Sequence, residues 1–212
     1  GSGKTEVYFE AINKCLMERK QVLVLLPEIS MTTQWFDRFK KRFKTDPLLW
    51  HSDIKESEKI KIWKSIIEDN VNIVVGARSA LFLPFKNLGL IIIDEEHDQS
   101  FKQEEGIIYN ARDMAVVRAK ISNIIIILCS ATLSIETKLN ILEKKYGVVK
   151  LKDRYGEAGL PEVKIIDLGK NPPEKGMWLS NDVHRELKKT IESGNQALFF
   201  LNRRGFAPYV FC

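Results

Sequence analysis

The sequence predicts an α/β fold, in which helices cover both faces of a parallel β-sheet. Apolar runs rich in β-branched residues alternate along the chain with segments whose apolar residues repeat at helical spacing. Such alternation is typical of βαβ units, whose crossover helices lie on the faces of a parallel sheet. The run at residues 22–26 is continuously apolar and ends at Pro27, which indicates a strand buried on both faces. Three further strands are predicted at residues 72–75, 88–93 and 124–128.

The helices between these strands are predicted from the spacing of apolar residues. The residues that recur at helical spacing are Val7, Ala11 and Cys15 with Tyr8, Ile12 and Leu16; Trp35, Phe36, Phe39 and Phe43; and Ile60, Trp63, Ile66 and Ile67. Residues 111–120 form a further helical candidate. We interpret the aromatic residues at 35, 36 and 39 as core packing and not as base-stacking groups.

Beyond residue 151 the pattern loosens. Glycine and proline are frequent from residue 156 to 176, which is typical of a connector, with one short strand predicted at 163–167. A helix at 182–192 and a strand at 197–201 then begin a second α/β unit. The predicted division is therefore a first unit at 1–150, a connector at 151–181 and the start of a second unit at 182–212.

Composition narrows the class of protein but does not identify a partner. The 212 residues are 44% hydrophobic and 29% charged, which is ordinary for a globular α/β protein and excludes disordered and fibrous classes. The 33 basic and 28 acidic residues give a net charge of +5. This small excess is compatible with a polyanionic partner without requiring one.

The cysteines and the apolar runs predict a cytoplasmic protein. Cys15, Cys129 and Cys212 are too widely spaced to suggest a disulfide framework, which favours a reducing compartment. The apolar runs are far shorter than the roughly 20 residues that span a bilayer, so no membrane association is expected. The chain starts inside a motif without an initiator Met and stops just after an apolar run, so we expect both ends to be cut from a longer protein.

The first five residues match part of a phosphate-binding loop. Gly1, Ser2, Gly3, Lys4 and Thr5 correspond to the last five positions of G-x-x-x-x-G-K-[ST], whose first glycine would lie upstream. Glycines let the backbone wrap an anion, Lys4 reaches the outer phosphates, and the Thr5 hydroxyl suits Mg²⁺. The alternative is a flexible Gly-Ser terminus or a cloning remnant. A position directly before a strong helix favours the phosphate loop.

An acidic cluster, Asp94-Glu95-Glu96-His97-Asp98, follows the strand at 88–93 without a gap. The carboxyl ends of parallel strands face the ligand crevice, so Asp94 is expected beside a magnesium-bound nucleotide. One carboxylate can hold the metal through water and the next can orient the attacking water. The alternative is a solvated acidic turn. His97 by itself would be an ordinary surface or core histidine, because no cysteine or histidine partner has metal-ligand spacing.

These motifs, together with Ser130-Ala131-Thr132 after the last strand of the first unit, resemble those of superfamily 2 helicases. Longer strings resemble the primosomal protein N′, or PriA, family over nearly the whole chain. They are G-S-G-K-T-E-V-Y at 1–8, L-P-E-I at 26–29, G-A-R-S-A-L-F at 76–82, D-E-E-H-D-Q-S-F-K-Q-E-E-G at 94–106, Y-N-A-R-D at 109–113 and F-L-N-R-R-G-F-A-P at 200–208.

The resemblance implies a RecA-like P-loop NTPase fold, with residues 1–150 as the first, ATP-binding lobe and residues 182–212 as the beginning of a second RecA-like lobe. Lys4, Thr5 and Asp94 would bind ATP and Mg²⁺, Glu95 would activate water, and His97 would couple the ATP site to DNA. The segment Ser130, Ala131 and Thr132 would share that coupling. Cys212 would be the first ligand of a zinc-binding insertion, so zinc is expected in the full-length protein only.

Residues 99–113 match the family's aromatic-rich loop, which contacts single-stranded DNA. Phe101, Lys102, Tyr109 and Arg112 offer stacking faces beside cations, and stacking contributes about 1–3 kcal/mol per base. The alternative for Tyr109 is inward packing. Arg78 and Ser79 match a segment along the DNA backbone, and the alternative there is a helix cap.

The sequence departs from the family pattern at two places. Ser134 replaces a usual proline, and Ile107 or Ile108 stands where the family often has Trp. The missing Trp weakens the expected coupling to DNA.

The resemblance implies an ATP-dependent 3′–5′ DNA helicase that restarts stalled replication forks. Its expected partners are single-stranded and forked DNA, primosome proteins and single-stranded-DNA-binding protein, without a membrane. Residues 1–212 alone are expected to hydrolyse ATP poorly, because second-lobe arginines would lie beyond residue 212. One alternative is another P-loop NTPase, such as a kinase or transport ATPase, which does not explain S-A-T or the aromatic loop. The other is a DNA- or primosome-binding module with a relic nucleotide site, which the intact Lys4, Asp94 and Glu95 disfavour.

Overall fold

The computed structural model describes residues 3–27, 32–151 and 161–200. The chain divides into two compact units, residues 1–158 and 159–212, which are described separately. The predicted roles of Gly1, Ser2 and Cys212 fall outside the described residues. The predicted division into lobe, connector and second lobe stays a prediction.

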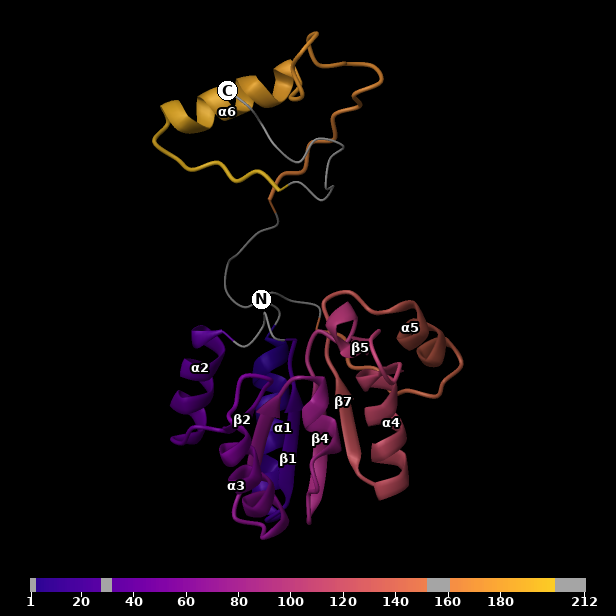
Figure 1. Cartoon of the computed structure of the whole chain (residues 1–212). Helices are drawn as coiled ribbons and strands as arrows, with labels where there is room; N and C mark the ends of the chain where they lie inside the picture. The colour runs from indigo at the N-terminus through magenta and orange to yellow at the C-terminus, as the bar shows by residue number, and fades with distance from the viewer. Residues whose placement is uncertain (1–2, 28–31, 152–160, 201–212) are drawn as a thin grey trace. The chain divides into compact units, whose positions relative to one another are not determined.

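A parallel five-stranded sheet forms the centre of the first unit, with strand order β2-β3-β1-β4-β7 (Figure 1). The strands are β1 (Gln21–Leu25), β2 (Leu48–Trp50), β3 (Ile73–Gly76), β4 (Leu88–Ile93) and β7 (Ile125–Leu128). All four strands predicted in this unit are present, and the predicted parallel sheet flanked by helices is confirmed. The edge strand β2 was not predicted, because its three residues carry no β-branched run.

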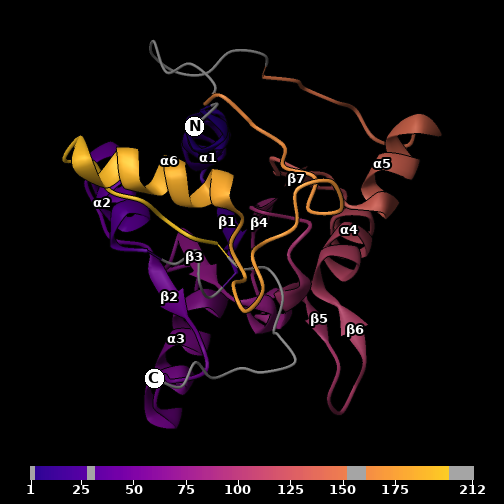
Figure 2. The same ribbon diagram turned by 90° about the horizontal axis from the view of Figure 1, so that it is seen from above.

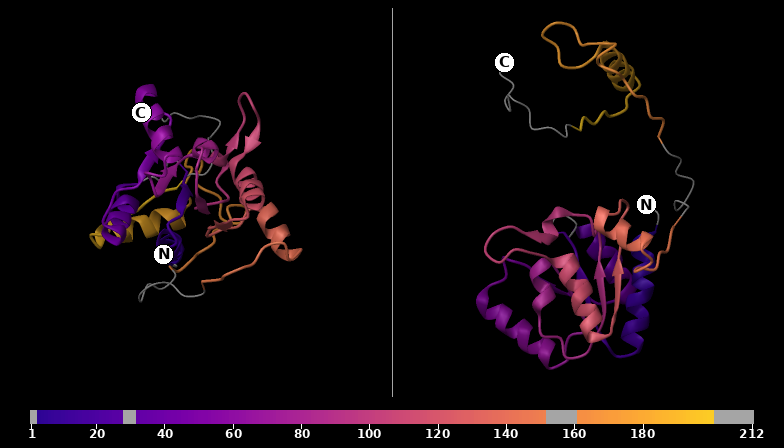
Figure 3. Two further views of the ribbon diagram at one scale, coloured as in Figure 1. Left: turned by 90° about the horizontal axis from the view of Figure 1, so that it is seen from below. Right: turned by 90° about the vertical axis from the view of Figure 1, so that its right-hand side faces the viewer.

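Two helices cover each face of this sheet, as the view along its edge shows (Figure 3). The helices are α1 (Lys4–Met17) and α2 (Thr33–Phe43) on one face, and α3 (Glu56–Ile67) and α4 (Ala111–Ser122) on the other. Successive side chains of a strand point to opposite faces, so Val22 and Val24 pack against α1 and α2 while Leu23 and Leu25 pack against α3 and α4. The aromatic residues of α2 belong to the core, as expected.

Two predicted helices are present with a different buried face. In α3 the buried residues are Ile62 and Ile66, whereas Trp63 is largely exposed, as are Ile60 and Ile67. Helical spacing alone fits either set, and only the packing against the sheet selects one. In α1 the buried set includes Phe9, which packs edge to face against Trp35 and Phe43.

A short hairpin interrupts the chain between β4 and α4. It consists of η3 (Gln99–Phe101), β5 (Lys102–Gln103) and β6 (Tyr109–Asn110), in which Lys102 pairs with Asn110 across the antiparallel strands. Its tip projects away from the sheet (Figure 2). The segment thus has regular structure where the sequence predicted only a loop.

The second unit contains α6 (Asn181–Glu192), which confirms the helix predicted at 182–192. Ser180 caps this helix by accepting a hydrogen bond from the backbone of Val183. The strands predicted at 163–167 and 197–201 were wrong for the described residues, because 163–167 and 197–200 form no strand. A β-strand is stabilised by a hydrogen-bonded neighbour, and the described part of this unit offers none. None of the helices in the described ranges has both the length and the apolar character that a membrane crossing requires.

One buried amide joins the loops at the amino end of the sheet. Gln21 is fully buried, and its Nε2 donates to the carbonyls of Ile66 (3.1 Å) and Val71 (2.9 Å). Its Oε1 accepts from the backbone N–H of Asn87 at 2.9 Å. The side chain therefore bonds three backbone groups, of which the Ile66 carbonyl also accepts from the Asp69 N–H.

We expect Gln21→Leu to lower the free energy of unfolding by about 2–4 kcal/mol, because three backbone groups lose their hydrogen bonds to the Gln21 side chain. Urea unfolding followed by circular dichroism measures the change. Gln34→Leu, at an exposed position of α2, is the matched control and should change stability by no more than about 0.5 kcal/mol. Equal effects of the two substitutions would contradict this account.

Candidate active site

Three segments of the first unit meet at the carboxyl edge of the sheet: the start of α1, the turn after β4 and the segment after β7. The turn is held on both sides by backbone hydrogen bonds. Asp94 N–H donates to the carbonyl of Leu25 (3.1 Å), Cys129 N–H to that of Ile93 (2.8 Å) and Glu96 N–H to that of Cys129 (3.0 Å). The parallel register of β1, β4 and β7 thus fixes where the acidic cluster lies.

The start of α1 presents a lysine to this edge. Gly3 precedes the helix with φ 81°, a left-handed conformation that favours glycine, and it provides no side-chain cap. The first N–H groups of a helix lack intrahelical partners and attract anions. Lys4 Nζ lies 2.9 Å from Glu95 Oε1, and both side chains are partly exposed. Lys4 and Glu95, predicted to act on the same nucleotide, are therefore in contact.

Asp94 is anchored from the helix side of the site. Its side chain is buried, and Oδ2 accepts a hydrogen bond from the Tyr8 hydroxyl at 2.9 Å. Trp35 Nε1 donates to the same hydroxyl at 2.7 Å, so α1 and α2 jointly fix the carboxylate. Burial raises the pKa of Asp94, although the hydrogen bonds from Tyr8 and the Glu95 N–H and the charge of Lys4 oppose this shift.

The backbone turns sharply at Glu95, whose φ is 50°. Left-handed backbone is uncommon for a residue with a side chain and indicates a conformation held by its surroundings. The turn places the neighbouring carboxylates of Asp94 and Glu96 inside the protein and leaves Glu95 partly exposed beside Lys4.

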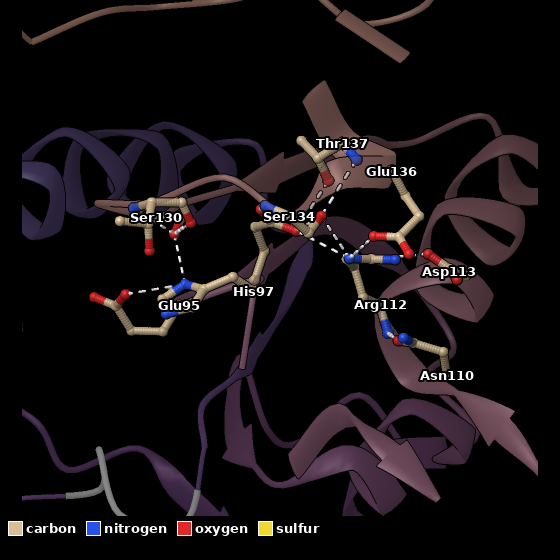
Figure 4. A network of polar contacts seen from close by, with 11 residues as sticks. Glu95, His97, Asn110, Arg112, Asp113, Ser130, Ser134, Glu136 and Thr137 are labelled. Atoms are coloured by element: carbon tan, nitrogen blue, oxygen red, sulfur yellow. Dashed lines mark hydrogen bonds and ion pairs between the residues drawn. The ribbon is translucent and has the colours of Figure 1, made fainter. Parts of the chain in front are cut away.

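His97 and Ser130 lie together on the exposed side of the turn (Figure 4). His97 Nδ1 is 2.7 Å from Ser130 Oγ and 3.6 Å from Glu95 Oε2. The Ser130 hydroxyl also bonds the backbone carbonyl of Thr132 and accepts from its N–H. The structure therefore brings the predicted coupling residues together, with exposed Ala131 between them.

The donor set fits a magnesium-bound nucleotide. Thr5 lies in the first turn of α1, and the Asp94 carboxylate is bonded to Tyr8 of the same helix, so both oxygen donors belong to this end of α1. Oxygen ligands of this kind suit Mg²⁺. Lys4 and the start of α1 lie beside them, where phosphates would be neutralised.

Two residues of the predicted DNA-contacting set face inward. Phe101 is 1% exposed and belongs to the core between the sheet and α4, so its ring offers no face to a base. Arg112 is 5% exposed and is surrounded by carboxylates. We correct the prediction of direct DNA contact for both. Tyr109 is half-buried and packs edge to face on Phe82 at 5.3 Å, which agrees with the alternative of inward packing.

Two of the remaining predicted DNA residues, Arg78 and Lys102, line a polar hollow of about 640 Å³. It is lined by Arg78, Gln99, Lys102, Gln103, Glu104 and Glu105. Arg78 Nη1 donates to the carbonyls of Ser100 (3.2 Å) and Lys102 (3.0 Å) and so holds the base of the hairpin. Ser79 Oγ accepts from Trp50 Nε1. Because η2 (Arg78–Phe82) starts after Ala77 without a side-chain cap, the helix-cap alternative for Arg78 and Ser79 was wrong.

Sequence reasoning missed three residues that organise the site: Tyr8, Glu96 and Ser134. Tyr8 was counted only as part of an apolar helix stripe, although a buried tyrosine hydroxyl normally requires a polar partner. Ser134 was noted only as the replacement of a usual proline. It caps α5 (Ile135–Leu142) by accepting from the N–H of Thr137, and it contacts Glu96.

Comparison with known proteins gives one family and several relatives. Residues 1–141 match the family described as DEAD/DEAH box helicase. All 212 residues align with proteins named Replication restart protein PriA: the identity is 50% with that of Rickettsia felis and 43% with that of Haemophilus influenzae. Over 214 aligned residues, which include the whole chain, it is 42% with that of Bacillus subtilis. The chain spans 33%, 29% and 26% of these three proteins, respectively, which is a third of their length or less.

We expect Cys129 to react slowly with iodoacetamide. Burial and the charges of Asp94 and Glu95 raise the pKa of its thiol to about 12, against the opposing charge of Lys4. The thiolate is the reactive form, and a higher pKa means less thiolate at pH 8. The rate should be about 10²- to 10³-fold below that of the unfolded chain, as followed by site-resolved mass spectrometry.

Asp94→Asn removes one of the charges that raise this pKa, so it should accelerate alkylation of Cys129. Glu143→Gln, at an exposed position, is the matched control and should leave the rate unchanged. Alkylation of the folded protein at the unfolded rate would contradict the placement of Cys129 beside the acidic cluster.

Proposed function

The chain belongs to the DEAD/DEAH box helicase family, and we propose that it forms the ATP-binding part of a DNA helicase motor for restarting stalled replication forks. Membership of that family implies nucleotide binding with a divalent metal ion. The contact of Lys4 with Glu95, beside the Asp94 carboxylate, is the observation that carries the proposal. The name shared by the relatives supports the role in replication restart.

Each residue of the site is assigned one part of ATP hydrolysis. Bound Mg²⁺·ATP supplies the transferable phosphoryl group and a cation that neutralises charge. Asp94 and Thr5 would hold the metal, and the start of α1 would orient the phosphates. Lys4 leaves Glu95 for the phosphates, which frees the Glu95 carboxylate to orient the attacking water. The loss of one ion pair therefore assembles the hydrolytic site.

DNA is proposed to bind beside the hairpin formed by β5 and β6. Lys102 is exposed there, and Ile107 and Ile108 are 81% and 73% exposed at the tip. An exposed cation beside exposed apolar side chains suits single-stranded DNA, whose phosphates and bases both need partners. His97 follows Glu95 by two residues and contacts both Glu95 and Ser130, and we assign His97 and Ser130 the coupling of hydrolysis to DNA.

The finer parts of the function rest on the relatives and on the family strings. We propose 3′–5′ translocation on single-stranded DNA, unwinding of forked DNA, and assembly with primosome proteins and single-stranded-DNA-binding protein in the cytoplasm. Zinc is proposed for the full-length protein, with Cys212, outside the described residues, as its first ligand.

We expect the complete gene product to hydrolyse ATP faster when single-stranded DNA is added. Lys4→Ala and Glu95→Gln should each lower the turnover number by at least about 10²-fold, because each removes a group that acts on the reacting phosphate. A coupled assay of ADP release measures this. Lys14→Ala and Glu58→Gln change exposed residues of α1 and α3 and serve as controls.

Full turnover by either site variant would contradict the assigned roles. Nucleotide binding without any hydrolysis by the wild type would instead favour a DNA-binding module with a relic nucleotide site. Turnover that single-stranded DNA leaves unchanged would favour another P-loop NTPase.

Lys102→Ala should weaken binding of single-stranded DNA to a similar degree for all sequences and reduce the salt slope by about 1, because one phosphate contact is lost. Fluorescence anisotropy at several salt concentrations measures both quantities. Lys61→Ala, at an exposed position of α3, is the control.

Duplexes with a single 3′ or 5′ tail test the polarity of unwinding, since a 3′–5′ motor requires the 3′ tail.

A further inference from the structure

Glu96 is the inward-pointing carboxylate of the acidic cluster, and its residue is 1% exposed. Four hydrogen-bond donors converge on it, and Figure 4 shows the residues that supply them, Arg112, Ser134 and Thr137. Ser134 N–H donates to Oε1 at 2.8 Å, and the hydroxyls of Ser134 and Thr137 each donate to Oε2 at 2.9 Å. Arg112 Nη1 lies 3.3 Å from Oε2. A carboxylate suits this environment because its oxygens accept only.

These four contacts join three segments that are distant in sequence. Glu96 belongs to the turn after β4, Arg112 to the first turn of α4 after the hairpin, and Ser134 and Thr137 to the start of α5. Ser134 Oγ also caps α5 by accepting from the Thr137 N–H at 3.2 Å. The buried carboxylate therefore fixes the start of α5, which follows the S-A-T segment, against the acidic turn.

The charge of Glu96 is matched inside the protein. Arg112 is 5% exposed, and its guanidinium contacts Glu96, Asp113 (2.8 Å) and the Ser134 hydroxyl (2.6 Å). Burial by itself would lower the pKa of Arg112, but the carboxylates of Asp113, Glu96 and Glu136 outweigh it and raise the pKa. The arginine remains charged, and a buried ion pair of this kind is costly to break from one side.

The residue before Glu96 is held in an unfavourable conformation. Glu95 has φ 50°, and a side-chain-bearing residue keeps left-handed backbone only where the surroundings fix it. Asp94 is anchored on one side by Tyr8 and by its own bond to the Glu95 N–H. Glu96 is anchored on the other side, through its side chain and through its N–H bond to the Cys129 carbonyl.

We propose that Glu96 is a positioning residue: its buried contacts hold the strained turn so that Glu95 and His97 face the nucleotide site. This inference rests on the proposed function, because it assigns Glu95 to ATP hydrolysis. Glu96 itself touches neither Lys4 nor the phosphate-binding start of α1, and it acts through the backbone of its neighbours. A change at Glu96 should therefore lower the rate of ATP hydrolysis and leave the affinity for the nucleotide unchanged.

Glu96→Gln tests the proposal with minimal change of shape. In the wild type, Oε2 accepts hydrogen bonds from Arg112, Ser134 and Thr137. An amide nitrogen at this position is itself a donor, so it would face the Arg112 N–H without forming a hydrogen bond. In the complete gene product we expect the turnover number for DNA-stimulated ATP hydrolysis to fall about 10- to 100-fold, as for a reacting group displaced by roughly 1 Å. The KM for ATP and the affinity for a fluorescent non-hydrolysable ATP analogue should stay within about twofold.

Glu136→Gln is the matched control. Glu136 also lies within 3.6 Å of the Arg112 guanidinium, but its side chain is 68% exposed and it does not belong to the turn. This variant should retain the wild-type turnover number and analogue affinity. Thr137→Val, which removes one donor to Glu96 and keeps the side-chain shape, should show a smaller fall in turnover and covers the case in which Glu96→Gln does not fold.

A fall in melting temperature with an unchanged turnover number per folded molecule would overturn the positioning role and leave Glu96 as a structural residue. Equal losses of analogue affinity and turnover would overturn it as well, because the whole site would then be disturbed. A wild-type protein that binds the analogue and shows no DNA-stimulated hydrolysis would instead reject the proposed function. These results are distinguishable in one set of measurements.

Discussion

The position of β4 between β1 and β7 is the constraint on which the site depends. Because the three strands are parallel and in register, their carboxyl ends lie along one edge, and every loop that leaves this edge does so beside the others. The backbone bonds from Asp94 to Leu25 and from Cys129 to Ile93 extend the pairing by one residue past the strands. The acidic turn is thus built on the most buried part of the sheet.

Much of this fold could be predicted from the sequence, because strands buried on both faces are continuously apolar. The runs that became β1, β3, β4 and β7 are continuously apolar, and this pattern predicted β7 even though Ile125 of that edge strand is 67% exposed. The failures lie where a segment is very short or has no pairing partner. The three-residue edge strand β2 has an exposed Leu49 between two half-buried residues, and the segment at 163–167 has no neighbouring strand within the described part of its unit. The pairing of β-strands depends on segments that are distant in sequence, so the residues of one segment alone do not reveal it.

The motifs of the candidate site could be recognised in the sequence, whereas the contacts that support them could not. Short motifs such as the phosphate loop and the acidic cluster report the residues that chemistry requires. Whether Phe101 faces DNA or the core depends on the packing of α4 against the sheet, to which its own sequence neighbourhood gives no clue. The same holds for Arg112: a cation in a loop suggests a phosphate contact, but three carboxylates surround it, and only Asp113 among them is a sequence neighbour. In both cases the burial of the side chain in the folded protein excludes the predicted contact with DNA.

The acidic turn is bonded to helices on both faces of the sheet, because Asp94 and Glu96 point to opposite sides of it. Asp94 is bonded to Tyr8 of α1, whose hydroxyl is fixed by Trp35 of α2, whereas Glu96 is bonded to the starts of α4 and α5. Between them, left-handed Glu95 turns away from both layers toward Lys4. A rotation of the turn that released one carboxylate would strain the other, because both are buried and need their donors. The strained residue is therefore held from both faces of the sheet, and this double attachment gives a small, polar and partly exposed segment the rigidity that its proposed role, orientation of a reacting water, requires.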